Sequence, residues 1–257
     1  MNMNIIKEFS SWIRTSPSLV MNDHRIAPSF PISSSDLTTS DHSDYEGNPR
    51  LGFLYQELCR RQFEASHPYR VVAEELQLQQ DNRTIGAIDF VLENLTTQQI
   101  EHWEVAIKFY LLKDGYWYGP NAKDRLDKKL HRMLEHQLMM TRTAAFQSLY
   151  PDFEDITQHL LMQGRLYINP FENPTIPEYC LGLKINPKRV TGFWCYQSQF
   201  DKINEPVYLL TKPLWATGLT AKGKSPVTEL PPHFIHCQSD TGHFWFVVPN
   251  DWPQSSM

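Results

Sequence analysis

The sequence predicts an α/β protein with a mixed sheet, and three observations lead to this prediction. Apolar residues recur at helical spacing over residues 49–65 and again over residues 121–142. Between these helices lie three extended stretches, at 71–79, 83–92 and 102–112. A helix followed by three strands and a further helix favours a mixed α/β sheet.

The composition indicates a packed core and no general attraction for nucleic acid. Of the 257 residues, 41% are hydrophobic and 12% are aromatic, and the net charge is −5. This length allows one large domain, or one domain with a substantial extension. A negatively charged chain needs a local basic patch to bind nucleic acid. The four cysteines show no paired spacing, which favours reduced thiols in a cytoplasmic protein over a disulfide framework.

The first 49 residues predict a helix followed by a loop. Residues 3–14 carry their apolar side chains on one helical face, and the pattern stops before Pro17. Residues 22–49 are rich in Ser, Asp, Thr and Pro, which is typical of a long loop. Lys7 and Glu8 interrupt the short apolar run, so we expect no secretion signal. Because no run of 18 apolar residues is present, we expect no membrane span.

The helix predicted over residues 49–65 carries one acidic side chain of interest. Its apolar stripe consists of Leu51, Leu54 and Leu58, and Glu57 lies near the edge of that stripe. The simpler interpretation makes Glu57 a surface glutamate that pairs with Arg60 or Arg61 one turn away. The alternative is a functional carboxylate beside the sheet.

The strongest functional signal lies on the two central strands. Both faces of residues 83–92 are apolar apart from Asp89, which is typical of a strand covered on both sides. In residues 102–112 the alternation places Glu104 and Lys108 on one face and only apolar side chains on the other. Charges inside an apolar strand are costly unless they are paired or bind a metal. We therefore expect Asp89 and Glu104 on adjacent strands, where their oxygens suit Mg²⁺ or Mn²⁺.

A structural alternative remains open for these charges. Glu104 and Lys108 can form an ion pair on one face of the strand, with Asp89 capping a turn. Three charged groups on two otherwise apolar strands are more than packing requires, which favours the catalytic interpretation.

The helix predicted over residues 121–142 begins with Asn121, a good N-cap, and has Gln137 on or beside its apolar stripe. Its other side is basic. A charged helix face is usually just solvated, but this one directly follows the acidic strand and is a candidate for binding a phosphate backbone. The basic residues proposed for that contact are Lys123, Arg125, Lys128, Lys129 and Arg132.

From Pro151 the sequence predicts a strand-rich half. Residues 155–167 favour a helix followed by a strand, and short strands are expected at 179–185, 191–196, 206–211 and 243–249.

Two other kinds of site have weaker support in the sequence. His233, His236, Cys237 and His243 suggest zinc, but their spacing matches no common ligand pattern and loop histidines are the preferred interpretation. The glycine-rich phosphate-binding loops and the G-x-S-x-G motif are absent from the sequence.

The central block resembles a known family. The run RTIGAIDFVL, HWEVAIKFYL and GPNAKDRLDKKLHRMLEHQL resembles the bacterial domain of unknown function 1853, with weaker similarity in the flanking blocks IRTSPSLV, GFWCY, KPLW and FWFVVPNDW. That family is thought to be related to the PD-(D/E)XK nucleases. The resemblance therefore implies a restriction-endonuclease-like three-layer α/β/α core and hydrolysis of phosphodiester bonds in DNA or RNA with Mg²⁺ or Mn²⁺.

The resemblance also implies roles for individual residues. Asp89 and Glu104 would be the metal carboxylates, Lys108 the catalytic lysine, Glu57 the acid of the first core helix, and Gln137 the glutamine of a later helix. Two departures from the superfamily pattern stand out. The acid and the lysine are spaced E-x-x-x-K rather than E-x-K, about 13 Å instead of about 7 Å along a strand. Alanines also occupy positions 87 and 106.

The expected organisation follows from these patterns. Residues 1–49 form a helix and loop arm, residues 50–150 the nuclease-like core, and residues 151–257 a strand-rich extension packed on it. The leading hypothesis is a metal-dependent nuclease. The competing hypothesis is a catalytically inactive nuclease-fold module that binds nucleic acid through residues 121–142, or a protein partner. Neither hypothesis involves a membrane.

Overall fold

The computed structural model describes residues 3–38, 43–219 and 225–254. It is an α/β protein with a large mixed sheet, and the described residues include five α-helices. The chain divides into two compact units. Unit 1 comprises Met1–Ile107 and Leu130–Gln163, and unit 2 comprises Lys108–Lys129 and Gly164–Met257. These limits differ from the expected boundaries at residues 50 and 150, because strands β4 (Gln99–Lys113) and β6 (Thr157–Ile168) each contribute to both units.

Two helices form in unit 1 where the apolar spacing predicts them. Helix α1 spans Met3–Thr15 and α2 spans Leu51–Glu64. The buried face of α1 carries Phe9, whose ring lies 6.3 Å from that of Tyr55 on α2. The Gln163 amide donates hydrogen bonds to the carbonyls of Ile13 and Ser16 at the C-terminal end of α1. These bonds satisfy carbonyls that the helix itself leaves unpaired.

Three antiparallel strands of unit 1 form consecutive hairpins. Strand β2 spans Tyr69–Gln80, and β3 spans Arg83–Asn94. Between them, Asp81 and Asn82 have φ values of 50° and 60°, as a tight two-residue hairpin turn requires. Strand β3 then pairs with β4, and the order in unit 1 is β6, β4, β3, β2. The loop before α2 contributes the short strand β1 (Val20–Met21) and a 3₁₀ turn at Ser34–Asp36.

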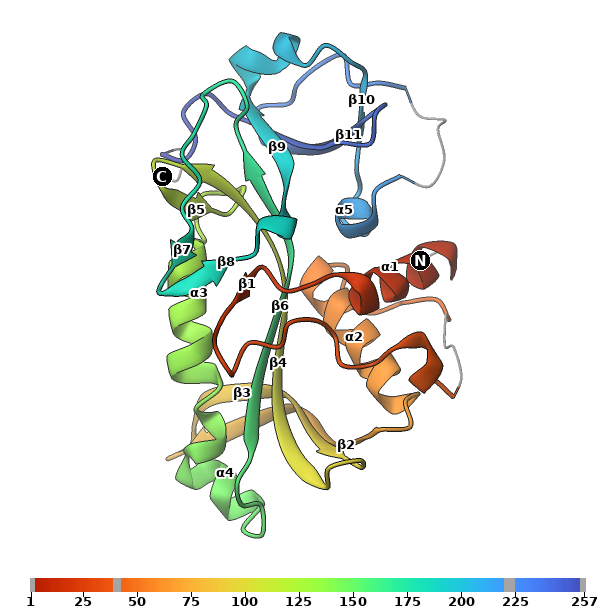
Figure 1. The fold of residues 1–257 in the computed structure, drawn as a ribbon, viewed down its shortest axis with the longest axis vertical. Helices are drawn as coiled ribbons and strands as arrows, with labels where there is room; N and C mark the ends of the chain where they lie inside the picture. Colours follow the sequence, from red (N-terminus) through yellow and green to blue (C-terminus); the bar gives the residue numbers. More distant parts are fainter. Residues whose placement is uncertain (1–2, 39–42, 220–224, 255–257) are drawn as a thin grey trace. The chain divides into compact units, whose positions relative to one another are not determined.

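Helices cover the strands of unit 1 on both sides. Figure 1 shows α1 and α2 on one side and α4 (Ala144–Leu149) on the other. Phe63 of α2 packs 5.4 Å from the ring of Phe90 on β3. On the α4 side, Phe146 and Met140 pack in one cluster with Ile88 of β3. The mixed sheet predicted from the sequence is therefore present, with helices on two faces.

The helix predicted over 121–142 is broken into shorter pieces. Helix α3 spans Leu126–Arg132, a π-turn follows at Met133–Gln137, and a 3₁₀ turn lies at Met140–Arg142. The prediction that Asn121 caps the helix is wrong. The Asn121 side chain accepts from the Lys123 N–H, and the Gly119 N–H donates to the Asp124 carbonyl, so these residues form a loop instead.

Unit 2 is strand-rich, as the sequence predicts. Its strands are ordered β10, β11, β12, β9, β6, with β9 parallel to both β6 and β12 and the outer pairs antiparallel. The bounds are β5 Tyr116–Tyr118, β7 Tyr179–Cys180, β8 Leu183–Ile185, β9 Val190–Tyr196, β10 Val207–Leu209, β11 Ile235–Ser239 and β12 Phe244–Val248. Short helical segments lie at Pro187–Arg189, Gln197–Lys202 and α5, Leu214–Thr217.

Two local predictions in this half are wrong. The helix expected at the start of 155–167 is absent, because Thr157–Ile168 is one continuous strand that is buried over most of its length. The loop expected around the histidines contains β11, whose pairing with β12 buries His236 and Cys237. Gly164, with φ at 146°, is required in β6: a Cβ there would lie 1.6 Å from the Lys108 carbonyl oxygen.

Candidate active site

Asp89 and Glu104 meet where strands β3 and β4 stop pairing along their backbones. The regular register runs from Asn94 opposite Gln99 to Phe90 opposite Trp103. One residue further, the Asp89 N–H donates to Glu104 Oε1 over 3.4 Å, and the Val105 N–H donates to Asp89 Oδ2 over 2.9 Å. Each carboxylate thus takes the place of a backbone carbonyl on the opposite strand. The structure brings these two predicted site residues together.

A buried histidine, which the sequence analysis did not single out, completes this cluster. His102 Nε2 lies 2.9 Å from Glu104 Oε1, and the two residues are 0% and 1% exposed. Burial lowers the pKa of His102 to about 4, although the negative charge of Asp89 opposes that shift. The imidazole is therefore neutral at pH 7, and its N–H donates to the carboxylate. The available signal was the two-residue spacing of His102 and Glu104, which places both on one strand face.

Helix α2 encloses the cluster with two weakly acidic groups. Burial raises the pKa of the Tyr55 hydroxyl and of the Cys59 thiol far above their usual values. The negative charge of Asp89 acts in the same direction on both groups. Both side chains consequently stay protonated at neutral pH. Asp89 itself is only half-buried, whereas Glu104 is fully buried.

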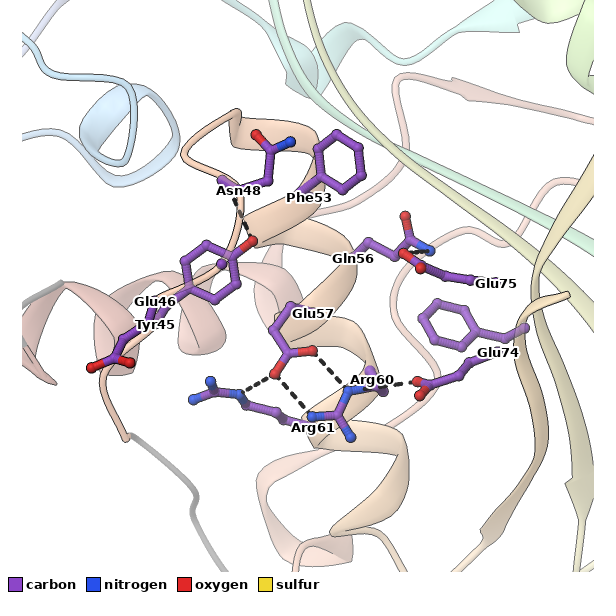
Figure 2. A pocket seen from close by; sticks show the side chains of 12 residues that line it. Tyr45, Glu46, Asn48, Phe53, Gln56, Glu57, Arg60, Arg61, Glu74 and Glu75 are labelled. Atoms are coloured by element: carbon purple, nitrogen blue, oxygen red, sulfur yellow. Dashed lines mark hydrogen bonds and ion pairs between the residues drawn. The ribbon is translucent and has the colours of Figure 1, made fainter. Parts of the chain in front are cut away.

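Glu57 lies apart from the carboxylate pair, in a surface cavity of about 400 Å³. Figure 2 shows its carboxylate between two guanidinium groups. Arg60 Nε and Arg61 Nε each donate to it over 2.7 Å. The hydrogen bonds and charges of Arg60 and then Arg61 hold the Glu57 pKa below its usual value, against the effect of burial. The simpler interpretation, an ion-paired glutamate on the helix, describes this geometry.

Lys108 belongs to unit 2 and has its own partner there. Its Nζ lies 2.8 Å from Asp124 Oδ2, and the Tyr110 hydroxyl donates to the same oxygen over 3.1 Å. The ion pair foreseen with Glu104 is replaced by this one, since Glu104 is held by His102.

Gln137 connects the π-turn after α3 to strand β3. Its Nε2 donates to the Ala87 carbonyl over 3.0 Å, two residues before Asp89. The contact is made to the backbone of β3, and the Ala87 side chain has no carboxylate that could bind a metal ion. The side chain therefore helps to position the strand segment that carries Asp89.

The basic residues of 121–142 are not equivalent. Arg125 makes two hydrogen bonds to Asp127, and its guanidinium carbon lies 4.3 Å from the centroid of the Tyr116 ring. Its charge is therefore neutralised locally. Lys129 is half-buried, whereas three residues project into solvent: Lys123, Lys128 and Arg132.

The described parts of the chain offer few arrangements of side chains that could bind a metal ion. Within them, no group of three or more His, Cys, Asp or Glu side chains is arranged to hold an ion. The histidine-rich segment is no exception, since His236 and Cys237 are consecutive on β11 and point to opposite faces of that strand. The carboxylate pair of Asp89 and Glu104 offers two protein ligands, and Mg²⁺ is commonly held by one or two carboxylates with water and substrate completing its shell. The four cysteines are free thiols, as the sequence predicts.

Comparison with known proteins gives a family and no characterised relative. No curated protein and no solved structure matches the chain significantly. The described residues contain no helix that is long and apolar enough to cross a membrane. A family model described as "Domain of unknown function (DUF1853)" matches residues 29–229, which include the whole carboxylate cluster. The chain therefore belongs to the DUF1853 family.

Proposed function

We propose that this protein is a metal-dependent nuclease that hydrolyses phosphodiester bonds in DNA or RNA, built on a restriction-endonuclease-like core. The observation that supports the proposal is the meeting of Asp89 and Glu104 at the point where β3 and β4 diverge. Two adjacent carboxylates on neighbouring buried strands carry a desolvation cost that packing alone does not require. A site for a divalent cation accounts for that cost.

In this proposal Asp89 and Glu104 hold Mg²⁺ or Mn²⁺. The bound ion would stabilise charge on the phosphate and lower the pKa of a water molecule. The protein orients the ligands: the His102 N–H and the Asp89 N–H fix Glu104, and the Val105 N–H fixes Asp89. Hydrogen bonds from outside the ligand shell commonly set the orientation of metal ligands in this way. Gln137 contributes by holding the backbone of β3 at Ala87.

Lys108 and Glu57 are not needed as reacting groups in this form of the proposal. The ammonium of Lys108 is paired with Asp124, and the carboxylate of Glu57 with two arginines. The proposal therefore rests on the carboxylate pair alone.

Cleavage assays with one conservative substitution test the proposal. We expect the wild type to cleave labelled DNA or RNA with Mn²⁺ or Mg²⁺, and Asp89→Asn to lose at least about 100-fold in rate because it removes a charged ligand. The matched control is Asp81→Asn, an exposed aspartate in the turn between β2 and β3 where asparagine tolerates the left-handed backbone. Equal cleavage by wild type and Asp89→Asn, or no cleavage of any substrate with either ion, would refute the proposal.

The second candidate is a catalytically inactive module that binds nucleic acid. The specific observation in its favour is that Lys108 and Glu57 are engaged in ion pairs while Lys128 and Arg132 on α3 are exposed. This candidate predicts binding that persists in EDTA and weakens as salt rises.

Charge reversal on α3 tests the second candidate. We expect Lys128→Glu with Arg132→Glu to weaken nucleic-acid binding at least tenfold and to reduce its salt dependence. Arg125→Gln is the control, since Asp127 already neutralises that guanidinium. Unchanged binding by the double variant would exclude α3 as the contact surface.

A further inference from the structure

A second cavity lies entirely within unit 2, and both apolar and polar side chains line it. Its volume is about 420 Å³, within the range of sites for small molecules. Trp215 and Phe234 contribute half-buried aromatic rings, and Leu209 and Val227 contribute aliphatic surface. One buried polar side chain, His236 of β11, also lines it. A cavity that combines apolar and aromatic side chains with a few polar groups is typical of ligand sites.

His236 is held rigidly but has one free ring nitrogen. The residue is 1% exposed, and its imidazole stacks on the Phe246 ring with centroids 4.1 Å apart. Its Nε2 lies 2.9 Å from the Tyr167 hydroxyl oxygen. Its Nδ1 is buried and has no hydrogen-bond partner among the described residues. Burial, assisted by the positive charge of Arg165, lowers the His236 pKa far below its usual value, so the ring is neutral.

The neighbours of His236 determine which nitrogen carries the proton. Arg165 Nη1 donates to the Tyr167 hydroxyl oxygen over 3.2 Å. The hydroxyl oxygen accepts there, and among the described residues its own proton has no acceptor other than His236 Nε2, so the hydroxyl donates to that nitrogen. Nε2 is then an acceptor, so Nδ1 carries the hydrogen of the neutral ring. The unpartnered atom is consequently an N–H donor.

The buried charge around this donor is positive. Arg165 is 6% exposed, and it also donates to the neutral carbonyls of Trp215 and Ala216. Within the described residues no carboxylate pairs with it. Arg189 is also largely buried, and burial with the nearby charge of Arg165 lowers its pKa to about 10. A buried cation without a counter-ion favours an anionic or strongly accepting group at the end of its hydrogen-bond chain.

We propose that this cavity binds a small hydrophobic carboxylic acid, aryl or short acyl, whose carboxylate accepts from His236 Nδ1 while its apolar part lies against Trp215 and Phe234. The hydrogen-bond chain runs from Arg165 through Tyr167 and His236 to the ligand, so the anion partly compensates the guanidinium. The exposed Glu229 at the cavity favours a ligand with a single acidic group that is directed inward. This site is independent of the proposed nuclease activity.

Binding of matched probes to the full chain tests the inference. We expect phenylacetate to bind by titration calorimetry at least tenfold more tightly than ethylbenzene, which has the same ring and no acceptor. In ¹⁵N spectra of the imidazole, phenylacetate should shift the Nδ1 resonance of His236. Failure of wild-type protein to bind phenylacetate, or equal affinity for both probes, would overturn the proposal.

Two variants distinguish the contribution of the His236 N–H donor to ligand binding from that of the cavity. His236→Phe keeps a ring against Phe246 and removes the donor, and it should weaken phenylacetate binding at least tenfold while leaving ethylbenzene binding unchanged. Leu209→Trp adds bulk at an exposed position of the cavity lining and should weaken binding of both probes, which tests the site even if His236→Phe fails to fold. His243→Phe is the control, because that histidine is largely exposed and lies outside the cavity lining. Wild-type affinity for phenylacetate in both His236→Phe and Leu209→Trp would contradict the assignment.

Discussion

Among the described residues, unit 1 and unit 2 each bury one histidine in a sheet, and the surroundings of these two histidines differ in charge. His102 in unit 1 faces Glu104, with Asp89 near by, whereas His236 in unit 2 faces Tyr167, which is hydrogen-bonded to Arg165. Burial keeps both imidazoles neutral. The comparison shows that burial determines the protonation state of each histidine, while the charge of the neighbouring groups determines which kind of ligand the cluster can bind. The first cluster suits a cation, and the second suits an acceptor.

The two clusters also differ in how they join the backbone. The carboxylates of unit 1 accept from the backbone N–H groups of Asp89 and Val105, so they are part of the sheet itself. In unit 2 the guanidinium donates to backbone carbonyls, and the hydrogen bond of the His236 ring goes to the Tyr167 side chain. Substitutions in unit 1 should therefore cost more stability than substitutions in unit 2.

The largest effect is expected from Glu104→Ala. This substitution leaves the His102 and Asp89 N–H groups without their acceptor and opens a cavity, at a cost of about 3–5 kcal/mol in the free energy of unfolding. Glu104→Gln keeps one acceptor oxygen and should cost only about 1 kcal/mol. Urea denaturation of both variants measures the difference. Similar small losses in the free energy of unfolding for both variants would show that the cluster contributes little to the stability of the sheet.

The second-largest expected effect is the change in the free energy of unfolding with pH. The pKa of His102 is about 4 in the folded state against about 6.5 for an exposed histidine in the unfolded chain, so the unfolded chain binds more protons between these values. Stability from this group is complete above pH 6.5 and is lost as the pH falls toward 4, by about 3 kcal/mol in total.

Urea titrations from pH 7.5 to 4.5 measure how the free energy of unfolding changes with pH. His102→Gln removes the titrating group, so the variant should show a smaller loss of stability on acidification than the wild type. His236, whose pKa is also depressed, accounts for part of the pH dependence of stability that remains in the His102→Gln variant. An unchanged slope in His102→Gln would contradict the assignment of a neutral His102.

The smallest effect is expected from Tyr167→Phe in unit 2. The ring keeps its contact with Phe246, at 4.8 Å between centroids, but Arg165 and His236 each lose one hydrogen bond. We expect a loss of about 2 kcal/mol in the free energy of unfolding. Tyr208→Phe, at a residue whose ring is not buried, should change stability by less than about 0.5 kcal/mol. A loss at position 167 as large as that of Glu104→Ala would remove the distinction between the two units.

Local sequence patterns predicted the elements that bury one continuous face. The alternation over 102–112 is strand β4, and the one-sided apolar spacing gave α1 and α2 nearly to the residue. These patterns succeed because helical and extended periodicities are properties of neighbouring residues. They failed at residues 155–167, where a buried strand and a buried helix have equally apolar sequences.

The sequence by itself determined that Asp89 and Glu104 lie on the central strands and that α3 carries basic residues. Only the tertiary structure decided their partners. It pairs Lys108 with Asp124 and Glu57 with Arg60 and Arg61, and it places the His236 donor at the end of a hydrogen-bond chain from Arg165. The physical reason is that a charged side chain inside a protein is defined by the groups it meets across space, and most of these lie far away along the chain.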